Sequence, residues 1–148
     1  MLITGHDWLR QLTAAALTAE RSLCACAMTA HAPHHSGRGQ VEEFFGALAI
    51  AHNAGVRVRV RLADLPRSSP ACAGNSAAVH WLRSRGIDAA THRGLGILHA
   101  KALLIDDRRA FIGSGNFTGA SADRNDEVWI ETRDAADLNA LLAWFNQR

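Results

Sequence analysis

The segment that most constrains the fold is the run Val-Arg-Val-Arg-Val-Arg-Leu at residues 56–62. Apolar and charged side chains alternate strictly there, which is the pattern of a β-strand with one buried face. A helical pattern over residues 42–53 precedes this strand, and Gly55 between them is a typical helix-ending residue. A helix followed by a half-buried strand indicates a protein in which helices pack on a sheet.

The rest of the chain alternates helices and strands early and forms hairpins late. Strands are predicted at 22–29, 56–62, 87–92, 97–105, 110–112 and 127–132, with a hairpin turn at 106–109. Helices are predicted at 7–20, 42–53, 75–85 and 134–145, capped in three cases by Asp7, Asn75 and Asp134. This order predicts the α/β class, with a mixed β-sheet flanked by helices on both faces. For 148 residues we expect a single domain, 1–148.

Composition narrows the function classes. The formal net charge is only +2, from 16 basic and 14 acidic residues, so a strongly basic nucleic-acid-binding protein is excluded and any such contact needs a local patch. Three cysteines without metal-binding spacing favour a reducing compartment. The sequence shows neither a leader segment nor an apolar run of about 18 residues. We therefore expect a cytoplasmic protein without stable membrane association.

Two polar clusters suggest ligand binding but have simpler explanations. The three arginines of the 56–62 strand share one face, which we interpret as solvated or salt-bridged rather than as a nucleic-acid contact: Arg57, Arg59 and Arg61. Three histidines surround Pro33 with no cysteine or carboxylate nearby, so a loop is favoured over a metal site: His31, His34 and His35.

The strongest functional signal is a motif in the last third of the chain. It reads His99-Ala-Lys101, then Asp106 five residues later, then Gly-Ser-Gly-Asn at 113–116. On a strand, His99 and Lys101 project from one face and Asp106 from the other. A nucleophile or base, a fixed cation and several hydrogen-bond donors suit a phosphoryl group. Asp106 is therefore interpreted as structural, paired with turn amides or an arginine near the hairpin, with direct proton transfer as the alternative.

This pattern resembles the signature of the phospholipase D superfamily, H-x-K-x4-D-x6-G-S-x-N, and the chain matches every element from His99 to Asn116. Asn125 and Glu127 match a further N-x-E feature of that superfamily. The resemblance implies phosphodiester cleavage through a phosphohistidine, without a metal or other cofactor. It implies that the nucleophile is His99, that Lys101 and Asn116 hold the non-bridging oxygens, that Ser114 supports the turn or bonds phosphate, and that Glu127 orients and charges the histidine.

One copy of the motif raises a chemical problem. Attack and departure take place on opposite sides of phosphorus, so one imidazole cannot be both nucleophile and general acid. Two-motif members of the superfamily supply a second histidine from a second copy, whereas its small bacterial endonucleases dimerise. We therefore predict a homodimeric endonuclease acting on nucleic acid, with Arg93 as a candidate contact to the substrate backbone. The alternatives are a phosphodiesterase acting on phospholipid head groups and a catalytically idle nucleic-acid-binding module.

Overall fold

The computed structural model describes residues 1–33, 39–94 and 96–148. Its seven strands are β1 (Leu2–Thr4), β2 (Ser22–Ala27), β3 (Arg57–Ala63), β4 (Asp88–His92), β5 (Ala102–Ile105), β6 (Arg109–Gly113) and β7 (Val128–Thr132). Its helices are α1 (Trp8–Ala16), α2 (Gln40–Asn53), α3 (Pro70–Arg83), α4 (Gly119–Asp123) and α5 (Ala135–Asn146).

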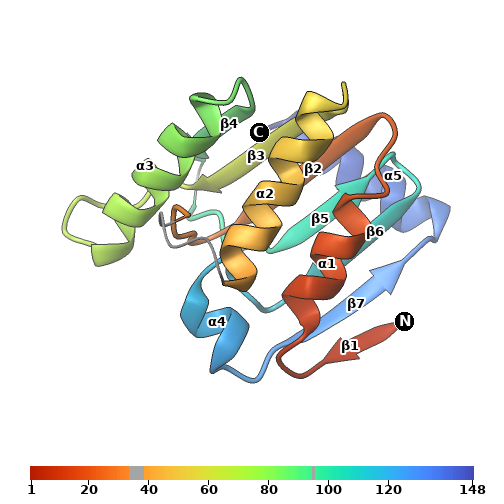
Figure 1. Ribbon diagram of the computed structural model, residues 1–148, viewed down its shortest axis with the longest axis horizontal. Helices are drawn as coiled ribbons and strands as arrows, with labels where there is room; N and C mark the ends of the chain where they lie inside the picture. Colours follow the sequence, from red (N-terminus) through yellow and green to blue (C-terminus); the bar gives the residue numbers. More distant parts are fainter. Residues whose placement is uncertain (34–38, 95) are drawn as a thin grey trace.

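The strands form one mixed sheet in the order β1-β7-β6-β5-β2-β3-β4 (Figure 1). β2, β3 and β4 pair in parallel, and helices connect them. β5 pairs antiparallel with β2, and the run β5, β6, β7 and β1 is antiparallel throughout. The predicted change from helix–strand alternation to hairpins therefore corresponds to the two halves of this sheet, and β5 joins them.

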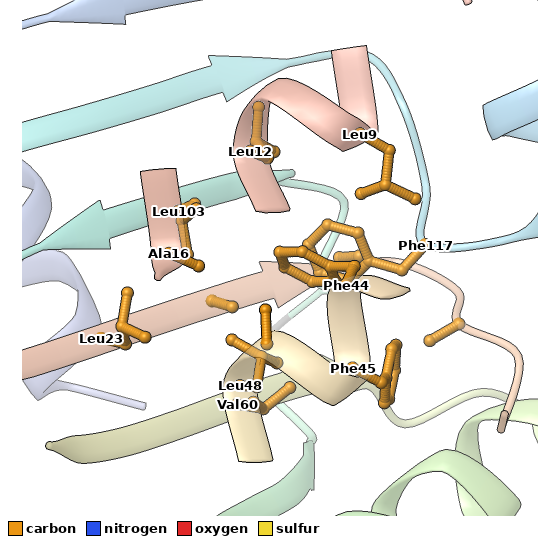
Figure 2. Packing of buried hydrophobic residues seen from close by; sticks show 14 of the residues in the cluster. Leu9, Leu12, Ala16, Leu23, Phe44, Phe45, Leu48, Val60, Leu103 and Phe117 are labelled. Carbon is orange, nitrogen blue, oxygen red and sulfur yellow. The ribbon is translucent and has the colours of Figure 1, made fainter. Parts of the chain in front are cut away.

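Helices cover both faces of the sheet, as predicted. On one face, α1 and α2 bury a large apolar cluster that includes Leu9, Leu12, Phe44, Phe45 and Leu48 (Figure 2). On the other face, α5 packs Leu138 and Phe145 against side chains of the central strands: Cys24, Cys26, Ala102, Leu104 and Ala110. The alternation along β5 determines this division, because Leu103 and Ile105 join the first cluster while Ala102 and Leu104 join the second.

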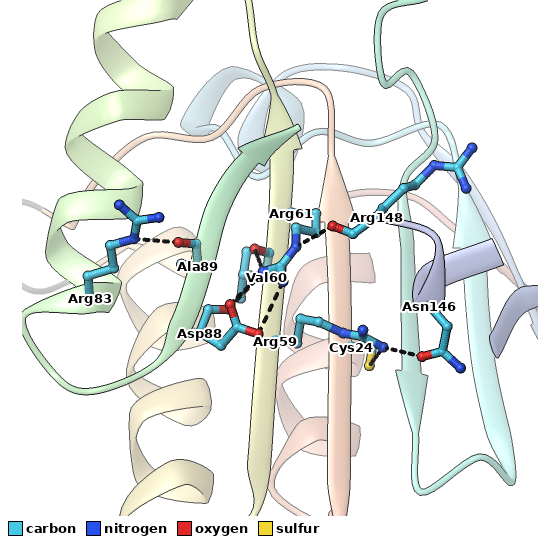
Figure 3. Close-up of polar contacts among 9 residues, drawn as sticks. All are labelled: Cys24, Arg59, Val60, Arg61, Arg83, Asp88, Ala89, Asn146 and Arg148. Atoms are coloured by element: carbon cyan, nitrogen blue, oxygen red, sulfur yellow. Dashed lines mark hydrogen bonds and ion pairs between the residues drawn. The ribbon is translucent and has the colours of Figure 1, made fainter. Parts of the chain in front are cut away.

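The arginine face of β3 is salt-bridged and hydrogen-bonded, as the sequence favoured. Arg61 forms an ion pair with Asp88 through two nitrogen–oxygen contacts of 2.9 and 3.1 Å, and its Nε donates to the carbonyl oxygen of Arg148 at 2.9 Å (Figure 3). Arg59 donates to Oδ1 of Asn146 at 3.0 Å. These side chains hold the end of α5 against the sheet.

Two elements begin five residues away from their predicted starts, and α1 ends at Ala16 rather than at residue 20. α3 begins at Pro70, not at Asn75, because proline fits the first turn of a helix, where its missing N–H costs nothing. Asn75 is instead buried inside the helix and accepts from the backbone N–H of Ala30 at 2.8 Å. The motif strand begins at Ala102, not at residue 97, so His99 and Lys101 lie outside regular strand structure. The expected shared face of His99 and Lys101 therefore does not apply.

Two short elements were not predicted: β1, which adds the edge of the sheet beside β7, and α4, which follows the Gly-Ser-Gly-Asn turn. The last helix is capped as predicted, because the side chain of Asp134 accepts from the backbone N–H groups of Ala136 and Asp137. In the part of the chain that the structure describes, no helix is both long and apolar enough to cross a membrane. His34 and His35 lie outside the described residues.

Candidate active site

Lys101 lies immediately before β5, and it is the single lysine of the chain. It is only 5% exposed, and its Nζ donates to the carbonyl oxygen of His99 at 2.7 Å. The same Nζ lies 3.1 Å from Nδ1 of His99. Burial lowers the pKa of Lys101 below the usual lysine value, while the charge of Glu127 opposes that shift. A desolvated ammonium group is thus fixed beside an imidazole.

His99 itself is exposed, because the segment that carries it runs outside the sheet. It lines an open hollow of about 720 Å³ on the side of α5. The C-terminal part of α5 and the residues after it provide Trp144 and Arg148, and the last residue of β4 and the residue after it are His92 and Arg93. A substrate can therefore reach the histidine, while Lys101 approaches from the interior.

Glu127 stands just before β7 and is bonded to hydroxyl groups, not to His99 as we expected. Its two carboxylate oxygens each accept at 2.5 Å, one from Ser114 Oγ and one from Ser121 Oγ. Burial acts to raise its pKa, but hydrogen bonds from Ser114, Ser121 and Asn125 and the charge of Lys101 outweigh burial and lower it. The carboxylate also acts on Lys101 by charge, and its predicted role toward His99 stays a prediction.

The Gly-Ser-Gly-Asn turn holds its side chains in place through several contacts. Ser114 is paired with Val128, its N–H donating to the Val128 carbonyl at 3.0 Å and its Oγ accepting from the Val128 N–H at 3.1 Å. The side-chain oxygen of Asn116 accepts from the backbone N–H of Thr29 at 3.1 Å. This contact uses the acceptor end of the amide, so the NH₂ group remains as the donor that a phosphate oxygen needs.

The two glycines of that turn are required by packing. A Cβ at Gly113 would collide with the ring of Trp129, and one at Gly115 would lie 2.6 Å from the ring of Trp8. The two indoles stack with centroids 4.9 Å apart and form the floor of the turn. The glycines therefore let the backbone approach this floor and bring Ser114 close to Glu127.

Sequence reasoning missed Ser121, which lies in α4 and connects several parts of the site. Its hydroxyl donates to Glu127 and accepts from the backbone N–H of Asn116 at 2.9 Å. Its own N–H donates to Thr118 Oγ1 at 3.3 Å, a helix-capping contact. The available signal for this helix start was Thr118, because threonine is one of the residues preferred at a helix N-cap.

Asp106 lies at the opposite end of β5 from Lys101. Its carboxylate accepts from the backbone N–H groups of Glu20, Arg21 and Ser22 at 2.7–2.9 Å. Burial acts to raise the pKa of Asp106, but these three hydrogen bonds outweigh burial and lower it. The amides belong to the turn before β2 and to the first residue of β2 rather than to the hairpin that follows Asp106, so the carboxylate ties two chain segments together.

Two further predicted groups can be placed. Arg93 projects at the rim of the hollow and pairs with Asp64, with Nε and Oδ2 2.7 Å apart. Among residues 1–33, 39–94 and 96–148, no group of three or more histidine, cysteine, aspartate or glutamate side chains is arranged to hold a metal ion. Metal independence stays a prediction that a chelator must test.

Residues 18–148 match the family model described as "Cardiolipin synthase, PLD-like domain". The chain belongs to the phospholipase D superfamily. It is 35% identical over 104 residues to a phospholipase D of Rickettsia felis, covering 69% of this chain and 49% of that protein. It is 29% identical over 143 residues to the human mitochondrial cardiolipin hydrolase, covering 97% of this chain and 51% of that protein. The chain spans about half of the length of these two relatives.

Solved structures of superfamily members have the same fold. Nuc from Salmonella typhimurium, a phospholipase D family member, superimposes with a TM-score of 0.78 at 23% identity, covering 100% of this chain and 93% of that chain. NucT from Helicobacter pylori superimposes with a TM-score of 0.80 at 16% identity, covering 99% and 92%. The predicted α/β phospholipase D-like fold is therefore confirmed.

Proposed function

We propose that this protein is a metal-independent phosphodiesterase, and specifically an endonuclease that cleaves nucleic acid in a site shared by two subunits. The observation that carries this proposal is the buried Lys101 ammonium fixed beside the exposed His99. A cation held in a desolvated setting stabilises charge on a phosphoryl group far better than one in water. Asn116 adds a donor, and Glu127 supports both the turn and the charge of Lys101.

The chemistry proceeds in two displacements. In the first, an imidazole nitrogen of His99 forms a bond to phosphorus, the bond from phosphorus to the leaving oxygen breaks, and the partner subunit's imidazolium gives that oxygen a proton. In the second, water attacks phosphorus, the phosphorus–nitrogen bond breaks, and the partner imidazole takes the proton from water. Lys101 and Asn116 hold the non-bridging oxygens throughout, and Ser114 keeps their turn in position.

A nucleic-acid substrate is favoured by the cationic rim of the hollow. Arg93 and Arg148 both line it beside His99, and each can meet a phosphate next to the scissile one. Arg148 also stacks on Trp144, with the guanidinium carbon 3.8 Å from the ring centroid, which gives a base a flat surface to rest on. A nucleic acid has both neighbouring phosphates and bases to use these groups, whereas a phospholipid has no base to rest on the flat surface.

The second candidate is hydrolysis of a phospholipid head group. It is favoured by the match to the cardiolipin hydrolase, which covers 97% of this chain. The catalytic residues would keep their roles, and only the contacts beyond the scissile phosphate would differ.

One set of assays tests both candidates. Labelled single-stranded and double-stranded DNA and RNA are incubated with the protein in EDTA, in parallel with vesicles that contain cardiolipin. We expect cleavage of an oligonucleotide at full rate in EDTA and no release of product from the vesicles. Cleavage of lipid alone would favour the second candidate, and activity that needs added magnesium would contradict the metal-free mechanism. Specific binding without turnover would favour the idle module.

A further inference from the structure

Arg57 is the arginine of β3 whose charge is not used by the fold. It is exposed, and within residues 1–33, 39–94 and 96–148 its guanidinium group forms no hydrogen bond or ion pair. Arg59 follows two residues later, so both side chains project from one face of β3, about 6.6 Å apart along the strand. This is the face that α5 partly covers, because Cys24, the partner of Arg59 on β2, packs in the α5 cluster. A free cation therefore stands next to a second cation on one sheet face.

Both arginines line a hollow of about 710 Å³ at the end of the sheet that lies away from His99. Ser22 of β2 is paired with Arg57 in the sheet and brings a hydroxyl group to the same hollow. Asn146, the last residue of α5, accepts from Arg59 through Oδ1, so its NH₂ group can donate to a ligand (Figure 3). Two guanidinium groups, a hydroxyl group and an amide are the donors that bind phosphate oxygens.

The arginines of this hollow outnumber its free carboxylates. Asp88 lines it, but its charge is paired with Arg61, whose Nη1 lies 2.9 Å from Oδ1 of Asp88. Asp107 also lines it, as an exposed residue of the turn between β5 and β6. The two guanidinium groups of Arg57 and Arg59 thus face one remaining carboxylate. An anion is favoured on balance, and loss of the Asp107 charge should favour it further.

The hollow opens on the same sheet face as the active site. Asp88 lines this hollow and His92 lines the hollow of His99, and both project from one face of β4, four residues apart. Four residues of strand span roughly 13 Å, which is the length of about four nucleotides of a duplex strand. The end of the chain borders both hollows, with Asn146 at one and Arg148 at the other. One nucleic-acid strand can therefore reach both.

We infer that Ser22, Arg57, Arg59 and Asn146 form a second binding site, which holds a backbone phosphate of the nucleic-acid strand about four nucleotides from the bond that is cleaved. We call it the Arg57 site. The inference rests on the proposed function for the identity of its ligand, because a polymer can occupy both hollows at once. A backbone contact positions a strand and adds affinity without reading its sequence. Long strands should therefore bind more tightly than short ones whatever their bases, and with a steeper dependence on salt.

The test compares Arg57→Gln with Arg10→Gln, a matched change at an exposed arginine of α1, which packs on the other face of the sheet. Binding of a fluorescein-labelled single strand of 20 nucleotides, as DNA and as RNA, is measured by fluorescence anisotropy at several salt concentrations. Arg57→Gln should weaken binding by roughly 5–10-fold and lower the salt slope by about 1, whereas Arg10→Gln should do neither. Arg57→Lys should keep most of the affinity, and Asp107→Asn should increase it.

Cleavage provides a second measurement. For wild type and each variant, kcat/KM is determined on the 20-nucleotide strand and on bis(4-nitrophenyl) phosphate, which is too small to reach the Arg57 site from His99. Arg57→Gln should lower the ratio of the two values by roughly 5–10-fold, because the lost contact is made by the strand alone. Arg10→Gln should leave the ratio at its wild-type value.

The outcomes separate this inference from the proposed function. If Arg57→Gln binds the strand as tightly as wild type, the Arg57 site is wrong, whatever the protein cleaves. If Arg57→Lys loses as much affinity as Arg57→Gln, the charge does not hold the strand, and the site is again wrong. If Arg57→Gln weakens binding but wild type cleaves no strand, the site stands and the proposed function fails. Weaker binding of Arg57→Gln to cardiolipin vesicles, with strand binding unchanged, would overturn the nucleic-acid ligand in favour of a lipid phosphate.

Discussion

At one end of β5, Lys101 is packed against His99, and the histidine faces an open hollow. At the other end, the carboxylate of Asp106 accepts hydrogen bonds from three backbone N–H groups at the start of β2 and in the turn before it. All three residues belong to one sequence motif, but His99 and Lys101 lie at the opposite end of a four-residue strand from Asp106. At the first end, the imidazole of His99 stays accessible for reaction. At the second end, the carboxylate of Asp106 holds two segments of the chain together. A signature motif can therefore combine residues kept for chemistry with residues kept for folding.

The largest effect that this comparison predicts is on activity at the histidine end. His99→Ala should lower turnover by at least about 10⁴-fold, because nucleophile and general acid disappear together in a symmetric site. Its unfolding free energy should stay close to that of wild type, since the side chain is exposed. His92→Ala is the control, because this histidine lines the same hollow. A loss of comparable size in His92→Ala would make that residue the general acid.

Asp106→Asn should show the reverse pattern. Asn tolerates the positive φ of 54° at this position, so the change removes the charge without adding backbone strain. The loss of hydrogen bonds to a charged acceptor should cost roughly 1.5–3 kcal/mol of unfolding free energy, while turnover per folded molecule stays within tenfold of wild type. Asp107→Asn is the matched control, since Asp107 is exposed and has a φ of 58°.

The stability difference between wild type and Asp106→Asn should also depend on pH. The folded-state pKa of Asp106 is lowered, so the carboxylate contributes stability above its unfolded-state pKa of about 3.9 and loses it as pH falls through the folded-state value. Urea unfolding at a series of pH values should show the full difference near pH 7 and a smaller one below about pH 4. If the difference stayed constant down to pH 2, the lost stability would not come from the ionised carboxylate of Asp106.

The smallest expected effect is a shift of the pH–rate profile in Glu127→Gln. Burial lowers the pKa of Lys101 and the Glu127 carboxylate opposes that shift, so removing the negative charge lowers the pKa of Lys101 further. Lys101 then loses its proton at lower pH, and the basic limb of kcat/KM should move to lower pH. Glu131→Gln is the control, because this carboxylate of β7 pairs with Arg109 and Arg133 instead. If the basic limb stayed at the same pH, the pKa of Lys101 would not be what determines its position.

Much of the fold was predictable because its signals are local. The alternation at 56–62 and the capping aspartate at 134 each depend on neighbouring residues, and both elements form. The start of the motif strand was not predictable. The apolar pattern of the sequence begins at Ile97, but the neighbouring strands β2 and β6 pair with this strand only from Ala102 onward. The partners of Glu127 were also hidden, since Ser121 reaches it only through the turn into α4.

The claim that two subunits share one site can be tested most directly by mixing chains. Wild-type and His99→Ala chains are unfolded together, refolded at a fixed total concentration and assayed on a phosphodiester substrate. If each site needs His99 from both subunits, only wild-type pairs are active, and activity falls as the square of the wild-type fraction, to about one quarter in an equal mixture. If each chain acts independently, activity falls in proportion to that fraction, to about one half, and this result would contradict the shared site.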